Sequence, residues 1–143
     1  MTPATPSATT PSTTLQGLRV LITQADTFMG PTLAEVFTAQ GATVIADTRP
    51  LADDPTAAAA AVADAGQVDV LLLHLALPAP ATAAQDIGEA EWRSVFAHMV
   101  DPMPRLVAAV LPQMLARQAG RILLMGSAAA LRGQKRTGSY SAA

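Results

Sequence analysis

The sequence predicts an α/β fold built on parallel strands, and three observations support this. Residues 18–47 have the pattern of a strand, a turn, an amphipathic helix and a second strand. Two further apolar runs, at 68–76 and 121–125, are typical of buried strands, and each follows a helical pattern. Successive strands joined by a helix in one sheet are nearly always parallel and right-handed. A chain of 143 residues is expected to hold one such domain or less.

The first unit places a strand at 18–23, a turn at 24–30 and a second strand at 42–47. Its helix is expected to begin near Pro31, because proline is favoured in the first helical turn, and to end at Gly41. The apolar side of this helix consists of Leu33, Ala34, Val36 and Phe37. These residues are expected to pack on the sheet.

The middle of the chain predicts two more helical stretches. Residues 57–65 are nearly all alanine, the residue with the highest helix propensity. A longer pattern covers 89–117, but Pro102 and Pro104 interrupt it, so a kink or break is expected near Asp101. The strand at 68–76 contains one polar residue, His74, which we expect to be a hydrogen-bonded structural residue.

Composition sets the wider limits. Residues 1–16 are dominated by Thr, Pro, Ser and Ala and carry no charge, which predicts a disordered tail before a folded part at 17–143. Cysteine is absent, which excludes disulfides and thiolate metal ligands and favours a cytoplasmic location. The net charge of −2 gives no basic surface for nucleic acid. No apolar run approaches the roughly 18 to 20 residues of a membrane span.

The candidate chemistry lies at 126–143, directly after the last predicted strand. Ser127 follows that strand, and Tyr140 opens a predicted helix thirteen residues later. A hydroxyl at a strand end can hold a substrate oxygen, and a nearby phenol can exchange a proton with it. Because a phenol ordinarily has a pKa of about 10, such a base needs a cation beside it. The pair taken alone also fits a strand-capping serine and a half-buried tyrosine.

Gly-Ser-Ala-Ala-Ala at 126–130 and Tyr-Ser-Ala-Ala at 140–143 together resemble the active-site segment of the short-chain dehydrogenase/reductase superfamily. That segment reads Ser, about a dozen residues, Tyr, three residues, then Lys or Arg. The resemblance implies a Rossmann-like, doubly wound parallel sheet with Ser127 and Tyr140 as catalytic residues. The basic residue would follow Ala143, so we expect a C-terminally truncated chain whose sheet is incomplete on that side.

The first turn departs from the nucleotide-binding members of the superfamily. Their three glycines, which let the backbone approach a pyrophosphate, align with Gln24, Phe28 and Gly30. The Phe28 ring would project into the space that the phosphates need, so no nicotinamide cofactor is expected. Asp47 stands where an acid would hold the adenosine ribose, but alone it is interpreted as a solvated carboxylate at a strand end.

The pattern Thr23, four residues, Phe28, one residue, Gly30 is similar to that of halohydrin dehalogenases, a branch of this superfamily without the nicotinamide. The similarity continues through residues 41–47 and 109–113. Leu-His-Leu-Ala at 73–76 and Met99 also replace the asparagine-containing motifs of reductases. The resemblance implies that Thr23, Phe28 and Gly30 form a substrate and halide pocket, and that the full-length protein is a homotetramer.

The function expected from this resemblance is cofactor-independent conversion of vicinal haloalcohols to epoxides, with release of halide. The reverse reaction would open epoxides with small anions. The partners would be a haloalcohol or epoxide and a halide, with no metal, nucleic acid or membrane. Two alternatives are an NAD(P)-dependent reductase with a degenerate glycine turn and an inactive truncated remnant.

Overall fold

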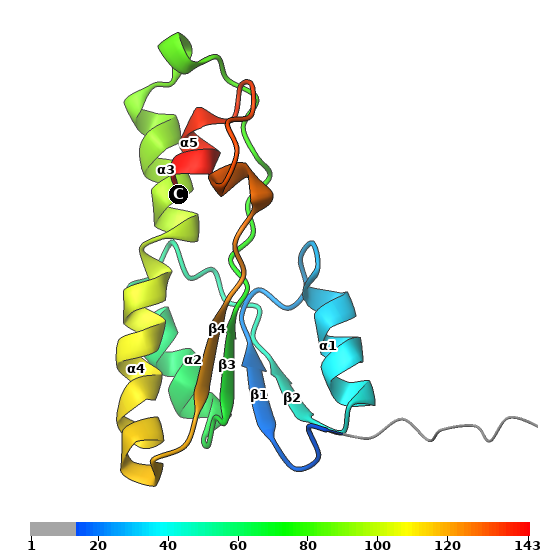
Figure 1. Ribbon diagram of the computed structural model, residues 1–143. Coiled ribbons are helices and arrows are strands. Elements are labelled where there is room, and N and C mark those ends of the chain that lie inside the picture. The colour runs from blue at the N-terminus through cyan, green and yellow to red at the C-terminus, as the bar shows by residue number, and fades with distance from the viewer. Residues whose placement is uncertain (1–13) are drawn as a thin grey trace, which may run out of the picture.

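The computed structural model describes residues 14–143, and its centre is a four-stranded parallel sheet (Figure 1). The strands are β1 (Arg19–Ile22), β2 (Thr43–Ala46), β3 (Val70–Leu73) and β4 (Arg121–Leu124). Their order across the sheet is β2-β1-β3-β4, so β1 pairs with both β2 and β3. This arrangement confirms the predicted parallel α/β fold.

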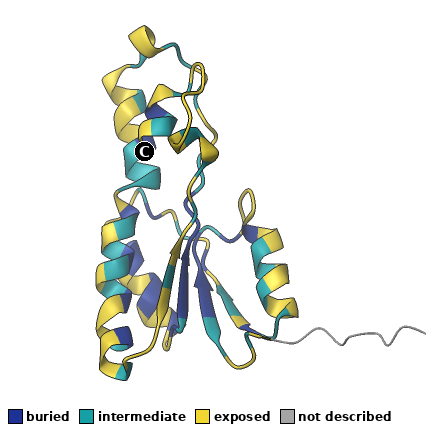
Figure 2. Ribbon diagram, in the orientation of Figure 1, coloured by how far each residue is buried: buried dark blue, intermediate teal, exposed yellow. Residues whose placement is uncertain are grey.

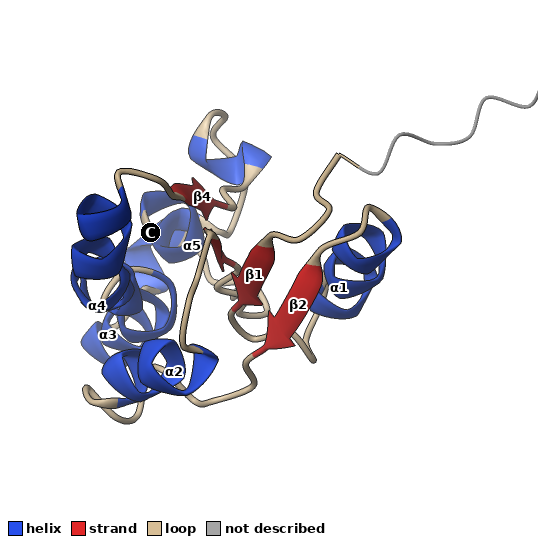
Figure 3. Cartoon of the chain, turned by 90° about the horizontal axis from the view of Figure 1, so that it is seen from below, coloured by secondary structure: helices blue, strands red, loops and turns tan. Residues whose placement is uncertain are grey.

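Helices cover both faces of the sheet (Figure 3). On one face lies α1 (Gly30–Ala39), and on the other lie α2 (Ala57–Ala65) and α4 (Pro102–Arg117). Beyond the carboxyl ends of the strands lie α3 (Glu89–Met99), α5 (Gly138–Ala142) and the short 3-10 segments η1 (Ala84–Asp86) and η2 (Ala128–Ala130). No helix within 14–143 is both long enough and apolar enough to cross a bilayer.

The core has two apolar layers, one on each face of the sheet. Figure 2 shows that buried residues are concentrated in the central strands. Leu21 and Leu71 point to the layer shared with α2 and α4, where Leu106 and Val110 also lie. The alternate strand residues, Val20, Ile22, Val70 and Leu72, point to the layer under α1. All four residues of β3 are buried because β3 lies between two strands and under helices on both faces.

The long helical pattern is broken where the prolines predict a break. Helix α3 ends at Met99 and α4 begins at Pro102 after two intervening residues. A proline lacks the backbone N–H that a continuing helix would use, but it fits the first turn of a new one. The break therefore lets α3 rise away from the sheet while α4 packs on it (Figure 1).

Two strand-end predictions need correction. The strand predicted at 68–76 covers only Val70–Leu73. Beyond Leu73 the backbone N–H groups bond to side chains of the turn after β1: that of His74 donates to the Thr23 hydroxyl at 3.1 Å, and that of Ala76 donates to the Gln24 Oε1 at 2.6 Å. Asp47, interpreted as a solvated carboxylate, is instead 6% exposed and forms an ion pair with the Arg49 Nε at 3.1 Å. A buried charge requires such a partner.

The start of the described chain packs on the domain. Leu15 lies against the apolar layer under α1, and its N–H donates to the Gln40 carbonyl at 3.1 Å. The folded part therefore includes residues before 17. The rest of the predicted tail, residues 1–13, lies outside the described residues.

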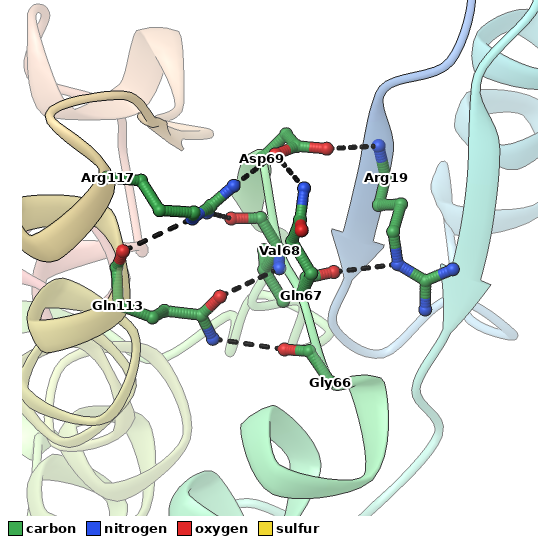
Figure 4. A network of polar contacts seen from close by, with 7 residues as sticks. All are labelled: Arg19, Gly66, Gln67, Val68, Asp69, Gln113 and Arg117. Carbon is green, nitrogen blue, oxygen red and sulfur yellow. Dashed lines mark hydrogen bonds and ion pairs between the residues drawn. The ribbon is translucent and has the colours of Figure 1, made fainter.

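A polar network joins the amino ends of β1 and β3 to α4 (Figure 4). The Asp69 carboxylate accepts hydrogen bonds from the Arg19 backbone N–H at 2.9 Å and from the Arg117 Nη1 at 2.6 Å. The Gln113 side chain bridges the Val68 N–H and the Gly66 carbonyl. The Arg19 N–H, helped by Arg117, holds the pKa of Asp69 below its ordinary value despite partial burial. The network fixes the end of the sheet opposite the strand carboxyl ends.

We expect Asp69→Asn to lower the free energy of unfolding at pH 7 by about 1 to 3 kcal/mol, since charge-assisted hydrogen bonds are lost. Because the folded pKa of Asp69 is depressed, the stabilisation is complete above the unfolded value of about 3.9 and is lost as pH falls through the folded value. The difference between variant and wild type in urea unfolding should therefore shrink below about pH 4. Glu35→Gln, on the exposed side of α1, is the control and should show no comparable loss at pH 7.

Candidate active site

A cavity of about 810 Å³ lies at the carboxyl ends of the strands. Its wall includes Phe28 from the turn after β1, Ser127 from the segment after β4, and Tyr140 from α5. Most of the other lining residues are apolar, among them Met99, Met103 and Leu124. Such a volume, with a few polar groups in an apolar wall, is typical of a small-molecule site.

Ser127 leaves β4 in an extended conformation and caps the 3-10 segment η2. Its Oγ accepts a hydrogen bond from the Ala129 N–H at 3.2 Å. The hydroxyl hydrogen is not used in this contact, so it can be donated to an oxygen in the cavity. The structure thus brings Ser127 and Tyr140 to one cavity, as their spacing suggests.

Tyr140 lies on a helix of only five residues, which is held in place by distant parts of the chain. Its neighbour Ser139 is fully buried and donates to the Glu91 carboxylate of α3 at 2.5 Å. The Arg136 guanidinium donates to the Ala81 carbonyl, and Thr137 forms a bridge with Thr82. The Ser139 hydroxyl is the main reason that the pKa of Glu91 lies below its ordinary value. These contacts join segments about fifty residues apart. No sequence motif predicts them.

The turn after β1 carries two non-glycine residues in the left-handed region. Gln24 has φ of 46° and Phe28 has φ of 47°. Such conformations cost of order 1 kcal/mol or more and persist only where other contacts impose them. The Gln24 side chain contacts the Ala76 backbone, and the Phe28 ring, 83% exposed, is stacked on His74 with a centroid separation of 6.4 Å.

Thr23 and Gly30, the other residues proposed for the halide pocket, are not among the residues that line this cavity. Thr23 is fully buried, and its hydroxyl donates to the His74 carbonyl at 3.0 Å while accepting from the His74 N–H at 3.1 Å. Gly30 begins α1 in contact with the turn backbone. Both residues shape the turn that presents Phe28.

Gly30→Ala is expected to distort this turn. A Cβ at Gly30 would lie 2.6 Å from the backbone carbonyl atoms of Ala25, and backbone cannot rotate away as a side chain can. Overpacking of this kind typically costs about 1 to 3 kcal/mol. Thermal unfolding of Gly30→Ala should show this loss. Gly133→Ala, where the added Cβ meets nothing within 4 Å, should be close to wild type.

Comparison with known families identifies the family of the chain. The family model described as short chain dehydrogenase matches residues 46–143. The chain belongs to the short chain dehydrogenase family. A comparison with curated protein sequences gives no match.

Solved structures share the fold. A "dehalogenation enzyme" has a TM-score of 0.79 and 30% identity, covering 90% of this chain and 61% of its own. A gluconate 5-dehydrogenase from Burkholderia cenocepacia, in complex with NADP and tartrate, has a TM-score of 0.82 at 21% identity, covering 92% of this chain and 62% of its own. A 3-oxoacyl-[acyl-carrier protein] reductase from Brucella melitensis with bound NAD has a TM-score of 0.81 at 19% identity, covering 95% of this chain and 65% of its own. The chain therefore spans less than two thirds of the length of these proteins.

Two of these structures contain NADP or NAD, so the fit of such a cofactor to this chain can be tested. A pyrophosphate needs an open, glycine-lined turn at the start of the first helix. Here the Gln24 side chain runs from the turn to Ala76, and Phe28 occupies the second glycine position. The Asp47 carboxylate, which would hold the adenosine ribose, forms an ion pair with Arg49 instead. The residues of the turn do not fit a dinucleotide. Among residues 14–143, no cluster of three His, Asp or Glu side chains forms a metal site.

Proposed function

We propose that this protein is a halohydrin dehalogenase, which converts vicinal haloalcohols to epoxides without a nicotinamide. The observation that carries the proposal is that Phe28, Ser127 and Tyr140 line one largely apolar cavity, next to a turn that does not fit a dinucleotide. The 30% identity to a dehalogenation enzyme supports it. A weakly hydrated halide is tolerated better beside apolar and aromatic side chains than a compact, strongly hydrated anion.

The proposed reaction needs one base and one hydrogen-bond donor. Tyr140, as phenolate, takes the proton of the substrate hydroxyl while Ser127 donates a hydrogen bond to the same oxygen. The oxygen then attacks the neighbouring carbon, the carbon–halogen bond breaks, and the halogen leaves with the bonding electrons as halide. The products are an epoxide and a halide ion. The basic residue proposed for the position after Ala143 would stabilise the phenolate.

The direct test is halide release from 1-chloropropan-2-ol in the absence of nicotinamide. It should use both the 143-residue chain and any longer chain that the same reading frame encodes. Release that is unaffected by added NADH or NADPH supports the proposal. Absence of release from both chains would contradict it and favour an inactive remnant. In an active protein, gel filtration would also test the proposed homotetramer.

The second candidate is an NAD(P)-dependent reductase, and the NADP- and NAD-containing structures of the same fold favour it. Thermal unfolding with added NADH and NADPH separates the two candidates. A ligand that binds only the folded state raises its stability, by about 2.7 kcal/mol at one hundred times its Kd. The dehalogenase proposal expects no such shift from either nucleotide.

A further inference from the structure

His74 is a buried polar residue in the cavity wall that the proposed reaction does not use. It lies directly after β3 and is only 2% exposed, although it is one of the residues that line the cavity. The Thr23 hydroxyl satisfies both its backbone N–H and its carbonyl. These two contacts fix the backbone, so the ring has a defined position.

The hydrogen-bond partners determine which nitrogen of the ring carries the proton. The Nδ1 of His74 lies 3.1 Å from the Gln24 carbonyl oxygen. A carbonyl can only accept, so Nδ1 must donate and must carry the hydrogen. In the neutral ring, Nε2 is then left with a lone pair and no hydrogen.

The Nε2 of His74 lacks such a partner. It is buried, and among residues 14–143 no group forms a hydrogen bond with it. A buried polar atom without a partner costs free energy, so its retention needs an explanation. A ligand in the cavity that brings a hydrogen-bond donor would supply one.

We propose that His74 is a ligand-binding residue, whose Nε2 accepts a hydrogen bond from a hydroxyl group in the cavity. We take this hydroxyl to be a second one, beside the oxygen that Ser127 and Tyr140 are proposed to hold, so the preferred ligand carries two hydroxyl groups. Because Nε2 is shielded, the ligand must displace a covering group. Phe28 lies over the face of the ring, with centroids 6.4 Å apart, and is itself 83% exposed, so it can move at little cost in buried area when a ligand enters. A lone pair at Nε2 also disfavours an anion beside this edge of the ring.

The inference concerns the same cavity as the proposed function but does not require halide release, so it can be tested by binding alone. The chain has two histidines, which makes their ring ¹⁵N signals simple to assign. His98, on α3, bonds to the Ser94 carbonyl, does not line the cavity and serves as internal control. The probes are propane-1,2-diol and propan-2-ol, which differ by one hydroxyl.

We expect the ¹⁵N spectrum to show the hydrogen of His74 on Nδ1, and propane-1,2-diol to move the Nε2 signal while His98 stays unchanged. The diol should bind roughly 2- to 10-fold more tightly than propan-2-ol. His74→Phe, which keeps a flat ring, should remove this preference. His74→Gln is the second variant if the first does not fold.

Three results would overturn the proposal: a hydrogen on Nε2 in the free protein, equal affinities for propane-1,2-diol and propan-2-ol, or a His74 Nε2 signal that does not move when the diol is added. Doubly protonated His74 with bound chloride would instead make the residue an anion site. Halide release is measured on the same samples, so that a failure of the His74 proposal can be distinguished from a failure of the dehalogenase proposal.

Discussion

Tyr140→Phe is expected to lower halide release from 1-chloropropan-2-ol by about 10²- to 10⁴-fold, the usual contribution of a positioned general base. The substitution removes only the phenol oxygen, so the ring in the cavity wall and the contacts of α5 are retained. The measurement is the initial rate of halide release by a chain that shows activity. The sequence has one tyrosine, so loss of the tyrosine absorbance verifies the variant directly.

Two serine variants accompany Tyr140→Phe, and the second of them is the control. Ser127→Ala should also reduce the rate, because the substrate oxygen loses its hydrogen-bond donor. Ser94→Ala, an exposed serine on α3 away from the cavity, should keep the wild-type rate. A Tyr140→Phe variant that releases halide as fast as Ser94→Ala would rule out the phenol as the base.

Leu106→Ala should produce a large loss of stability. Leu106 is fully buried on α4, where it packs in the layer between the sheet, α2 and α4. Replacing a buried leucine with alanine costs about 2 to 5 kcal/mol, through lost burial and the cavity that remains. That is a large fraction of the roughly 5 to 15 kcal/mol of a typical domain. Urea unfolding followed by circular dichroism measures the loss.

Leu111→Ala, on the same helix, is the matched control. Leu111 is 38% exposed, so the alanine variant leaves little enclosed space and should lose far less stability. Equal midpoints for the two variants would mean that α4 does not pack on the sheet as described.

The elements of the fold were largely predictable because local chemistry determines them. The alanine-rich helix occupies 57–65 as expected, and Pro102 starts a new helix where the pattern required a break. Apolar runs located all four strands. The end of β3 was not predictable, because the next backbone N–H groups, those of His74 and Ala76, bond to side chains 51 and 52 residues away in the turn after β1.

The candidate site was predictable only where residue type and spacing carry a signal. Ser127 and Tyr140 stood out by their positions after a strand and at a helix start, and the structure brings both to one cavity. The role of Ser139 was hidden, because its partner Glu91 is 48 residues away on α3. The free nitrogen of His74 was hidden as well, since it depends on which atoms Gln24 and Thr23 present to it.

The strand order has a consequence for how the chain folds. β1 pairs with β2 through the short crossover of α1, but its other neighbour, β3, is far along the chain, as shown by Arg19 and Asp69, which are 50 residues apart. Closing that longer loop costs chain entropy before the pairing of β1 with β3 returns any free energy. We therefore expect the β1–α1–β2 unit to form first, with one edge of β1 open. The docking of β3 beside it should then be the slow step that creates both apolar layers together.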